Sequence, residues 1–301
     1  MSARSLAHVL SVVAVAFVVG APAAHAIANG EEADAARTPW MVSITDDTDE
    51  RLPVSGRCGG SLIAPRLVLT AAHCLEGLED DALVVAGRQA VGQPAERSAR
   101  IARVRAHPRY RLEHPFGGGL QESTATSDIG LIELATPIDG PVLRLEPARA
   151  ARFSRPGRAA RLWGYGPIFN RPGACTDPPG TLPPCFAPGS LHQADLRLLS
   201  RKACGRSYRR ALDATMLCSL DRTGRRRAHA CPGDSGSPMA VRDGASWVQV
   251  GVVSWGAEVK RRRCDDTDLP MVMAHVSALR GWIDRASRRL SARGTLLVGG
   301  T

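Results

Sequence analysis

The most informative stretch of the sequence is Cys231-Pro232-Gly233-Asp234-Ser235-Gly236-Ser237-Pro238. A serine hydroxyl is a weak nucleophile until a neighbouring base removes its proton. Glycines beside the serine let the backbone turn tightly and present N–H groups to an oxyanion that forms during reaction. The stretch therefore predicts a nucleophile at Ser235, and a base for it has to be found elsewhere in the chain.

Two other stretches supply the partners that such a serine needs. One is Leu69-Thr70-Ala71-Ala72-His73-Cys74, which ends an apolar run, and the other is Ser127-Asp128-Ile129-Gly130-Leu131-Ile132, in which an acid opens a strand-like segment. Histidine titrates near neutral pH and suits a general base, and a buried aspartate fixes its tautomer and stabilises the imidazolium. The alternative is that both residues are structural, with His73 capping the core and Ser235 forming a turn.

In this order, His then Asp then Ser, the three stretches resemble those of the chymotrypsin-like serine proteases, trypsin included. The resemblance runs from Ile27 to about Ala286. It implies an all-β fold of two six-stranded antiparallel β-barrels with a C-terminal α-helix, and an active site in the cleft between the barrels. It also implies a serine-type endopeptidase that forms an acyl-enzyme, with His73 as general base, Asp128 as its orienting acid and Ser235 as nucleophile. A catalytically weak relative that acts as a binding protein is the alternative.

The same resemblance implies how the rest of the active site is built. The backbone N–H groups of Gly233 and Ser235 would form the oxyanion hole, and a free amine on Ile27 would pair with Asp234. The segment Ser254-Trp255-Gly256 would bind the substrate backbone as an added β-strand.

The pocket for the side chain before the cleaved bond departs from that of trypsin. Trypsin has Asp six residues before the nucleophile, where this chain has His229, and the family usually has Gly where this chain has Met271. We expect Met271 to project into the pocket, which would then be shallow or blocked and take small or neutral side chains rather than Lys or Arg. An acidic preference with protonated His229 as counter-charge is the weaker alternative, and His229 as a mere space-filling residue is the third.

The eight cysteines indicate disulfides, because an even number is typical of exported chains. Spacing alone leaves about 105 pairings open. The resemblance implies Cys58–Cys74, Cys204–Cys218 and Cys231–Cys264, and it leaves Cys175 and Cys185 to close a fourth bridge in a Pro-rich loop. No zinc site is expected, since the sequence has no Cys-x-x-Cys pair and its histidines lack ligand spacing. No cofactor or other metal is expected either, because no acidic loop clearly matches the calcium site that some members of the family have.

The N-terminus, residues 1–26, reads as an export signal. Arg4 precedes an apolar run from Val9 to Val19, and Ala24-His25-Ala26 has the small-x-small pattern of a cleavage site. The run is shorter than the roughly 20 residues that span a bilayer, so an uncleaved anchor is the less favoured alternative. We therefore expect a secreted, bacterial member of the family with no membrane span after cleavage. Cleavage would itself expose the amine of Ile27, so we expect no separate zymogen step.

The remaining chain divides into three parts. Residues 27–145 are expected to form the N-terminal barrel with His73 and Asp128, and residues 146–286 the C-terminal barrel with Ser235 and the helix. Residues 27–286 would make a single peptidase domain, and the tail 287–301 has no assignment.

Short β-branched segments bounded by Gly, Pro or Asp predict strands rather than alternating βαβ units. The expected strands are Trp40–Ile44, Ser61–Leu69, Ala82–Ala86, Ile101–Ala106, Ile129–Leu134, Ala159–Trp163, Gln193–Leu199, Met216–Ser219, Pro238–Val241, Val248–Trp255 and Met271–His275. Apolar spacing predicts one helix, Val276–Leu290. The expected linker is Glu146–Gly157, and the expected surface loops are Arg109–Ser127, Pro167–Ser190 and Asp221–Arg227.

Composition excludes several other classes. The chain has 301 residues, of which 44% are hydrophobic and 23% charged, so collagen, coiled coil and disorder are poor interpretations. Its formal net charge is +10, almost all from arginines along the whole chain, but aromatic residues make up only 4%. A nucleic-acid binder usually combines clustered charge with stacking aromatics. We therefore expect protein or peptide substrates and proteinaceous inhibitors as partners, and no nucleic acid.

Overall fold

The computed structural model of the chain describes residues 27–45, 56–78, 81–91, 93, 97–113, 124–148, 151–166, 168–169, 186–187, 189–209, 212–221, 228–231, 233–256 and 269–294. The predicted signal segment, Cys175, Cys185 and Cys264 lie outside the described residues. So do residues 295–301 of the tail that the sequence left without assignment.

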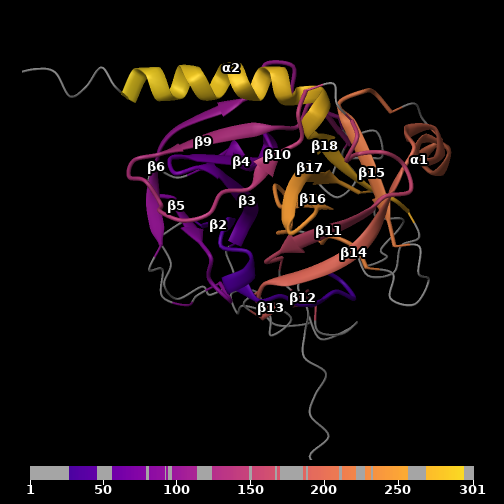
Figure 1. Ribbon diagram of the computed structural model, residues 1–301, viewed down its shortest axis with the longest axis horizontal. Helices are drawn as coiled ribbons and strands as arrows, with labels where there is room; N and C mark the ends of the chain where they lie inside the picture. The colour runs from indigo at the N-terminus through magenta and orange to yellow at the C-terminus, as the bar shows by residue number, and fades with distance from the viewer. Residues whose placement is uncertain are drawn as a thin grey trace, which may run out of the picture.

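Six strands close the first barrel (Figure 1). They are β2 (Met41–Thr45), β3 (Gly56–Ala64), β4 (Leu67–Thr70), β9 (Gly130–Leu134), β6 (Ser98–Ala106) and β5 (Leu83–Ala86), in that order around the barrel. Where the sequence predicted one strand over Ser61–Leu69, the chain turns at Pro65 and Arg66. Proline lacks the N–H that a continuous ladder needs, so the run divides there into two antiparallel strands.

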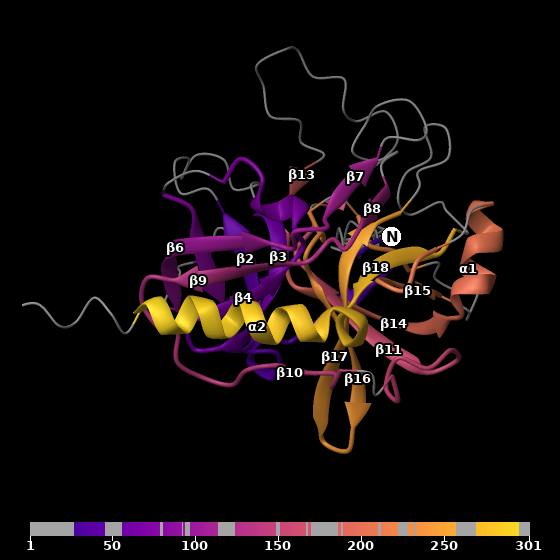
Figure 2. The same cartoon turned by 90° about the horizontal axis from the view of Figure 1, so that it is seen from above.

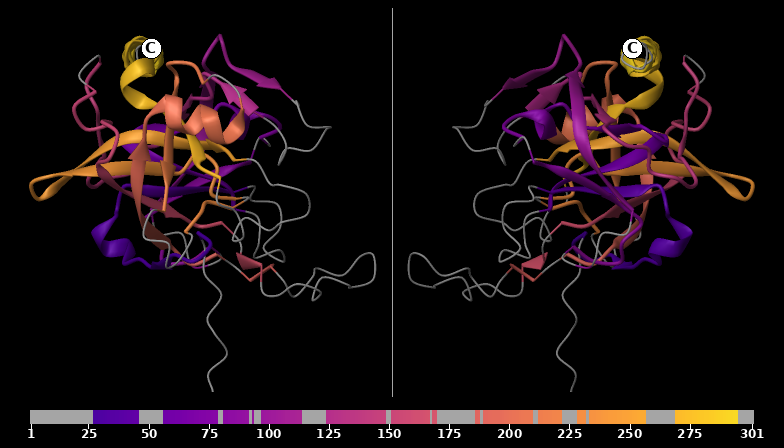
Figure 3. Two further views of the ribbon diagram at one scale, coloured as in Figure 1. Left: turned by 90° about the vertical axis from the view of Figure 1, so that its right-hand side faces the viewer. Right: turned by 90° about the vertical axis from the view of Figure 1, so that its left-hand side faces the viewer.

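Six further antiparallel strands close the second barrel. They are β14 (His192–Leu199), β11 (Ala159–Gly164), β16 (Pro238–Asp243), β17 (Ser246–Trp255), β18 (Met271–His275) and β15 (Met216–Leu220), and β15 pairs back with β14. Buried and more exposed residues alternate along β14, as expected for a strand with one face on a core. The hairpin of β16 and β17 extends beyond the barrel body (Figures 2 and 3). The predicted fold of two barrels and a C-terminal helix is confirmed.

Both ends of the described chain cross to the other barrel. Strand β1 (Glu31–Glu32) pairs with β14, and Ile27 is fully buried in the core of the second barrel. Helix α2 (Val276–Gly294) lies along the first barrel (Figures 1 and 2) and buries an apolar stripe that ends at Leu290 in that barrel's core. The helix thus continues four residues past the predicted end at Leu290, and the two barrels hold each other's terminal segments.

Several small elements were missed in the sequence. Helix α1 (Arg201–Tyr208) begins at Ser200, whose Oγ accepts a 3.2 Å hydrogen bond from the Ala203 N–H. The other missed elements are β1 (Glu31–Glu32), β7 (Arg111–Glu113), β8 (Thr124–Thr126), β10 (Arg144–Leu145), β12 (Ile168–Phe169), β13 (Phe186–Ala187) and two 3-10 turns, η1 (Ala35–Arg37) and η2 (His73–Leu75). The expected linker is also more than a connection, because Glu146 is fully buried and accepts hydrogen bonds from the N–H groups of Phe153 and Ser154.

Candidate active site

His73 and Asp128 meet because two strands of the first barrel pair. Strands β4 and β9 are antiparallel, with Thr70 opposite Gly130, so the residues just after β4 and just before β9 lie together. His73 Nδ1 lies 2.7 Å from Asp128 Oδ2, and the His73 backbone N–H donates to Asp128 Oδ1 at 3.0 Å. The Asp128 side chain is 1% exposed, whereas that of His73 is 18% exposed and so reaches the surface.

Ser254, at the end of β17 in the second barrel, also binds the carboxylate. Its Oγ donates a 2.6 Å hydrogen bond to Asp128 Oδ2. The sequence placed Ser254 on the substrate-binding strand, and this second role was missed because no local pattern shows which residue of the other barrel faces Asp128. One carboxylate thus accepts three hydrogen bonds from two barrels.

The electrostatics of the pair follow from this geometry. Burial raises the pKa of Asp128, but the charge of His73 and the hydrogen bonds from His73 and Ser254 outweigh it and hold the pKa below its ordinary value. Burial lowers the pKa of His73, but attraction to Asp128 and the hydrogen bond to it outweigh that effect and raise the pKa. Asp128 therefore stays ionised and favours the imidazolium form of His73.

Backbone hydrogen bonds hold the Ser235 segment between β3 of the first barrel and β17 of the second. Its carbonyl oxygen accepts a 2.7 Å hydrogen bond from the Gly59 N–H, and the Gly236 N–H donates to the Val253 oxygen at 2.9 Å. A Cβ added to Gly236 would lie 3.2 Å from Cys74 Sγ, directly after His73 in the chain. In the part of the chain that the structure describes, no hydrogen bond joins Ser235 Oγ to His73 Nε2, and such bonds are often long before substrate binds.

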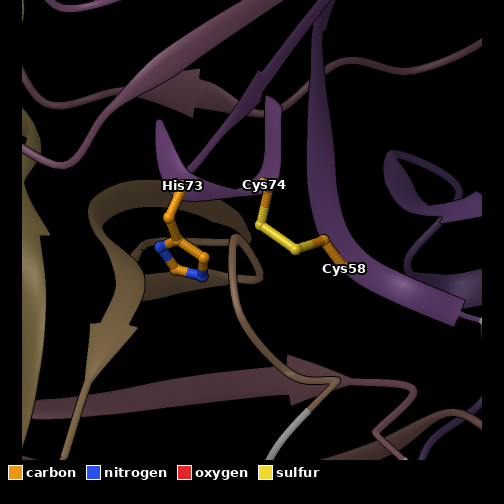
Figure 4. Close-up of side chains that lie close together, drawn as sticks. All are labelled: Cys58, His73 and Cys74. Carbon is orange, nitrogen blue, oxygen red and sulfur yellow. A yellow bond between two sulfur atoms is a disulfide. The ribbon is translucent and has the colours of Figure 1, made fainter. Parts of the chain in front are cut away.

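A disulfide between Cys58 and Cys74 fixes the loop that carries His73 (Figure 4). His73 and the two sulfur atoms lie within 4.8 Å of one another, but the sulfurs are bonded to each other and offer no thiolate to a metal ion. A second disulfide, Cys204–Cys218, joins α1 to β15, so both pairs that the resemblance implies within the described chain are present. Cys231 is also disulfide-bonded. The other described cysteines pair among themselves, and Cys264 lies outside the described residues, so the Cys231–Cys264 bridge stays a prediction.

The Asp234 carboxylate organises the loop before Ser235. It is fully buried and accepts hydrogen bonds from the N–H groups of Cys231 at 2.9 Å and Gly166 at 2.8 Å, and a further one from the Ile27 backbone. The predicted partners Ile27 and Asp234 are therefore together. Burial raises the pKa of Asp234 to about 6 against these hydrogen bonds.

Three glycines shape the same loop. Gly233 has a φ of +93°, in the left-handed region that favours glycine. A Cβ on Gly166 would lie 2.7 Å from Asp234 Cγ, and one on Gly164 would also overlap the carboxylate. Gly164 and Gly166 were not predicted from the sequence, although the run Trp163-Gly164-Tyr165-Gly166 places two glycines on the strand end that faces Asp234.

His229 and Met271 occupy the region of the predicted specificity pocket. A Cβ on Gly256 would lie 3.1 Å from His229 Cε1, so the imidazole lies against the backbone of the opposite wall. The Ala230 N–H lies 2.9 Å from Met271 Sδ, and Met271 is 2% exposed. The His229 side chain therefore reaches Gly256, and the Met271 side chain reaches Ala230. Both side chains fill the space between these segments.

His229 is buried in this position. Its Nδ1 lies 2.7 Å from the Ala230 carbonyl oxygen. Burial lowers the pKa of His229, although hydrogen bonds to the backbone of Ala230 and Leu269 act in the opposite direction. The imidazole is therefore neutral at physiological pH, which disfavours its use as a counter-charge for acidic residues.

Comparison with known proteins agrees with this geometry. The family model described as Trypsin matches residues 27–283. The chain is 32% identical over 278 residues to human transmembrane protease serine 5, covering 87% of this chain and 52% of that protein. It is 30% identical over 267 residues to rat transmembrane protease serine 9, covering 87% of this chain and 22% of that protein.

These relatives bear on two expectations. Both come from animals, so the expected bacterial source is not supported. Both are named as transmembrane proteins, whereas no described helix of this chain is long and apolar enough to cross a membrane. The chain spans about half the length of the human protein and about a fifth of the rat protein. The match over most of the chain, together with the two closed barrels, shows that the chain belongs to the trypsin family of chymotrypsin-like serine endopeptidases.

Proposed function

We propose that this chain hydrolyses peptide bonds through an acyl-enzyme on Ser235. His73 Nε2 takes the proton of Ser235 Oγ as that oxygen attacks the substrate carbonyl, and His73 then gives the proton to the leaving amine. Water then attacks the acyl-enzyme. His73 takes a proton from that water and returns it to Ser235 Oγ, which breaks the ester and releases the carboxylic acid. The observation that carries the proposal is the ionised, buried Asp128 held 2.7 Å from His73 Nδ1, which leaves Nε2 directed away from the carboxylate.

The oxyanion formed in each step would accept hydrogen bonds from the N–H groups of Gly233 and Ser235. The positive φ of Gly233 supports this role, because it turns the peptide that follows Cys231 and Pro232. Losing one such donor typically reduces kcat by about 100-fold to 1,000-fold.

We further propose that the mature chain begins at Ile27 and is secreted, with residues 27–286 as one peptidase domain. Two observations support this start: the Ile27 side chain is buried, and the Ile27 backbone nitrogen hydrogen-bonds to Asp234. A free ammonium group at that backbone nitrogen would neutralise the buried carboxylate. Cleavage of the signal would then complete the active site without a propeptide.

The filled pocket supports a preference for small or neutral side chains before the cleaved bond. His229 replaces the carboxylate that would attract Lys or Arg, and Met271 takes space that a glycine would leave open. The backbone of Ser254, Trp255 and Gly256 would still pair with the peptide. Preference among neutral residues then follows from the volume left by His229 and Met271.

The same filled pocket favours one alternative, a catalytically weak protein that binds partners. Fluorophosphonate labelling separates the two functions, because it requires an activated serine and no deep pocket. Stoichiometric labelling of the mature chain, absent in Ser235→Ala and in His73→Ala, supports the peptidase. An unlabelled chain that is folded and starts at Ile27 would support the binding protein.

A further inference from the structure

Two elements that lie side by side carry most of the net positive charge. Strand β6 contains three arginines and no acidic residue, and α2 contains five arginines and the single acid Asp284. Their net charges of +3 and +4 together make +7 of the chain's formal +10. The sequence shows arginine along the whole chain, and folding brings these two arginine-rich elements side by side.

Two contacts fix how α2 lies over β6. Near the middle of the strand, Arg103 Nη2 donates a 3.0 Å hydrogen bond to the Leu290 carbonyl oxygen. Just past the C-terminal end of the strand, the His107 ring packs edge-on against Trp282, with 5.0 Å between ring centroids. Arg105 shares a strand face with Arg103, so it lies between these two contacts beside the helix.

Arg109 and Arg285 approach the same point from different elements. Burial lowers the pKa of His107, and the charges of Arg109 and Arg285 act in the same direction, so that the pKa falls to about 4. Arg289 lies one helical turn beyond Arg285 on the same side of α2. Strand β6, the segment directly after it and α2 thus present one surface, the arginine face. It consists of Arg105, Arg109, Arg285, Arg288 and Arg289.

None of these five side chains is ion-paired or hydrogen-bonded to another part of the chain that the structure describes. Their neighbours are paired, since Arg103 binds Glu133 at 2.6 Å and Arg280 binds Asp284 at 2.7 Å. Like charges at i and i+4 repel on a helix surface, so Arg285 and Arg289 destabilise α2 in isolation. Five guanidinium groups with no ionic partner among the described residues suit an anionic ligand.

We propose that the arginine face binds a sulfated polysaccharide. A guanidinium group donates two parallel hydrogen bonds to a tetrahedral oxyanion such as sulfate. The helix sets Arg285 and Arg289 about 6 Å apart along its axis, a row suited to a polymer with repeated charges. Figure 3 shows α2 end-on at the molecular surface, beside the first barrel.

Other polyanions fit this face less well. Single-stranded nucleic acid relies on exposed aromatic rings for stacking, and Trp282 packs against His107 instead. Binding at a membrane surface needs a broad exposed apolar face. On β6 the one large apolar side chain that is exposed is Val104, at 44%, which is too little for such a face. The proposal is independent of peptidase activity, because none of the five arginines belongs to the candidate active site.

The test measures the affinity of the Ser235→Ala chain for a heparin fragment of defined length at about 150 mM salt. We expect Arg285→Gln/Arg289→Gln to raise Kd at least about tenfold, and to lower the salt dependence of binding by about two counterions. The control is Lys202→Gln/Arg206→Gln, which removes the same charge at the same spacing from α1 and should change Kd by less than about twofold. Arg105→Gln/Arg109→Gln tests the strand side of the face and should weaken binding like the α2 pair.

Several outcomes would overturn the proposal. Absence of heparin binding would do so, as would equal weakening by the α1 and α2 variants, which would reduce the effect to net charge. Equal affinity for desulfated heparin would exclude sulfate recognition. Tighter binding to single-stranded DNA or to anionic vesicles would assign the arginine face to a different partner.

Discussion

Ser254 and Asp128 belong to different barrels, yet Ser254 Oγ donates a 2.6 Å hydrogen bond to Asp128 Oδ2. The acid of the candidate site is therefore held from the first barrel through His73 and from the second through β17. The relative position of the barrels then controls the orientation of the His73 ring.

Replacing Ser254 should weaken catalysis without unfolding the chain. In Ser254→Ala, Asp128 loses one of its three hydrogen bonds, and a bond to a charged group contributes roughly 1.5–3 kcal/mol. We expect kcat/KM on a peptide substrate to fall about tenfold to 100-fold. Ser246→Ala, at the exposed start of β17, is the matched control and should leave kcat/KM unchanged. Wild-type activity in Ser254→Ala would show that this hydrogen bond does not position the base.

The pH dependence of activity should report the raised pKa of His73. The base must be neutral to accept a proton, so kcat/KM should rise with pH and level off above an inflection higher than 6.5. In Asp128→Asn the attraction and hydrogen bond that raise the pKa are lost, so the inflection should move lower. The same variant should reduce kcat by about 10⁴-fold. An inflection unmoved by Asp128→Asn would contradict the electrostatic account of the pair.

The stability of an uncleaved chain should depend on the Asp234 carboxyl group. Its folded pKa of about 6 lies above the ordinary 3.8, so between these values the folded state binds more protons than the unfolded state. Stability should therefore fall as pH rises from about 4 to 6, by about 3 kcal/mol for two pKa units. A mature chain whose Ile27 ammonium pairs with Asp234 should lack this loss.

Thermal unfolding of both chains between pH 4 and 7 measures the difference, with Ser235→Ala in each to prevent self-cleavage. Parallel pH profiles for the two chains would contradict a pairing between the Ile27 amine and Asp234. A mass spectrum of the exported protein that shows a start other than Ile27 would contradict activation by signal cleavage.

Gly166 should not tolerate a side chain. The Cβ of Gly166→Ala would lie 2.7 Å from Asp234 Cγ, so the carboxylate and the loop before Ser235 would have to move. We expect about 1–3 kcal/mol of destabilisation together with a loss of kcat. Gly281→Ala in α2 is the control, because its Cβ meets only Arg285 Nη1 at 3.4 Å, and alanine there should stabilise the helix by up to about 1 kcal/mol. Full activity in Gly166→Ala would show that the loop does not depend on the position of Asp234.

Opening the predicted pocket should change specificity rather than chemistry. In Met271→Gly the space beside Ala230 is emptied, so substrates with larger side chains before the cleaved bond should gain kcat/KM relative to those with alanine. The expected change in that ratio is at least about tenfold, since one or two methylene groups are worth roughly 1–3 kcal/mol in an apolar pocket. An unchanged ratio would place the specificity pocket elsewhere.

The sequence predicts the parts of this protein that short patterns encode. The stretches around His73, Asp128 and Ser235 identify the family, and β-branched segments such as β17 mark most strands. Helix α1 was missed because five of its eight residues are Arg, Lys, Gly or Ser, which leaves no apolar stripe to detect. The division of β3 from β4 depends on the single residue Pro65.

What could not be predicted depends on contacts between distant segments. The hydrogen bond from Ser254 to Asp128 spans 126 positions, and the closeness of Gly166 to Asp234 spans 68. The arginine face likewise requires α2 to cross back onto the first barrel, so that Arg285 and Arg109 both lie near His107. Such pairings arise from the packing of the two barrels and leave no local pattern.

The most direct test of the central proposal is cleavage of a mixed peptide library by the chain that begins at Ile27. The account predicts cuts after small or neutral residues, and their complete loss in Ser235→Ala and in His73→Ala. Cleavage that persists in Ser235→Ala, or no cleavage by a folded, correctly processed chain, would contradict it.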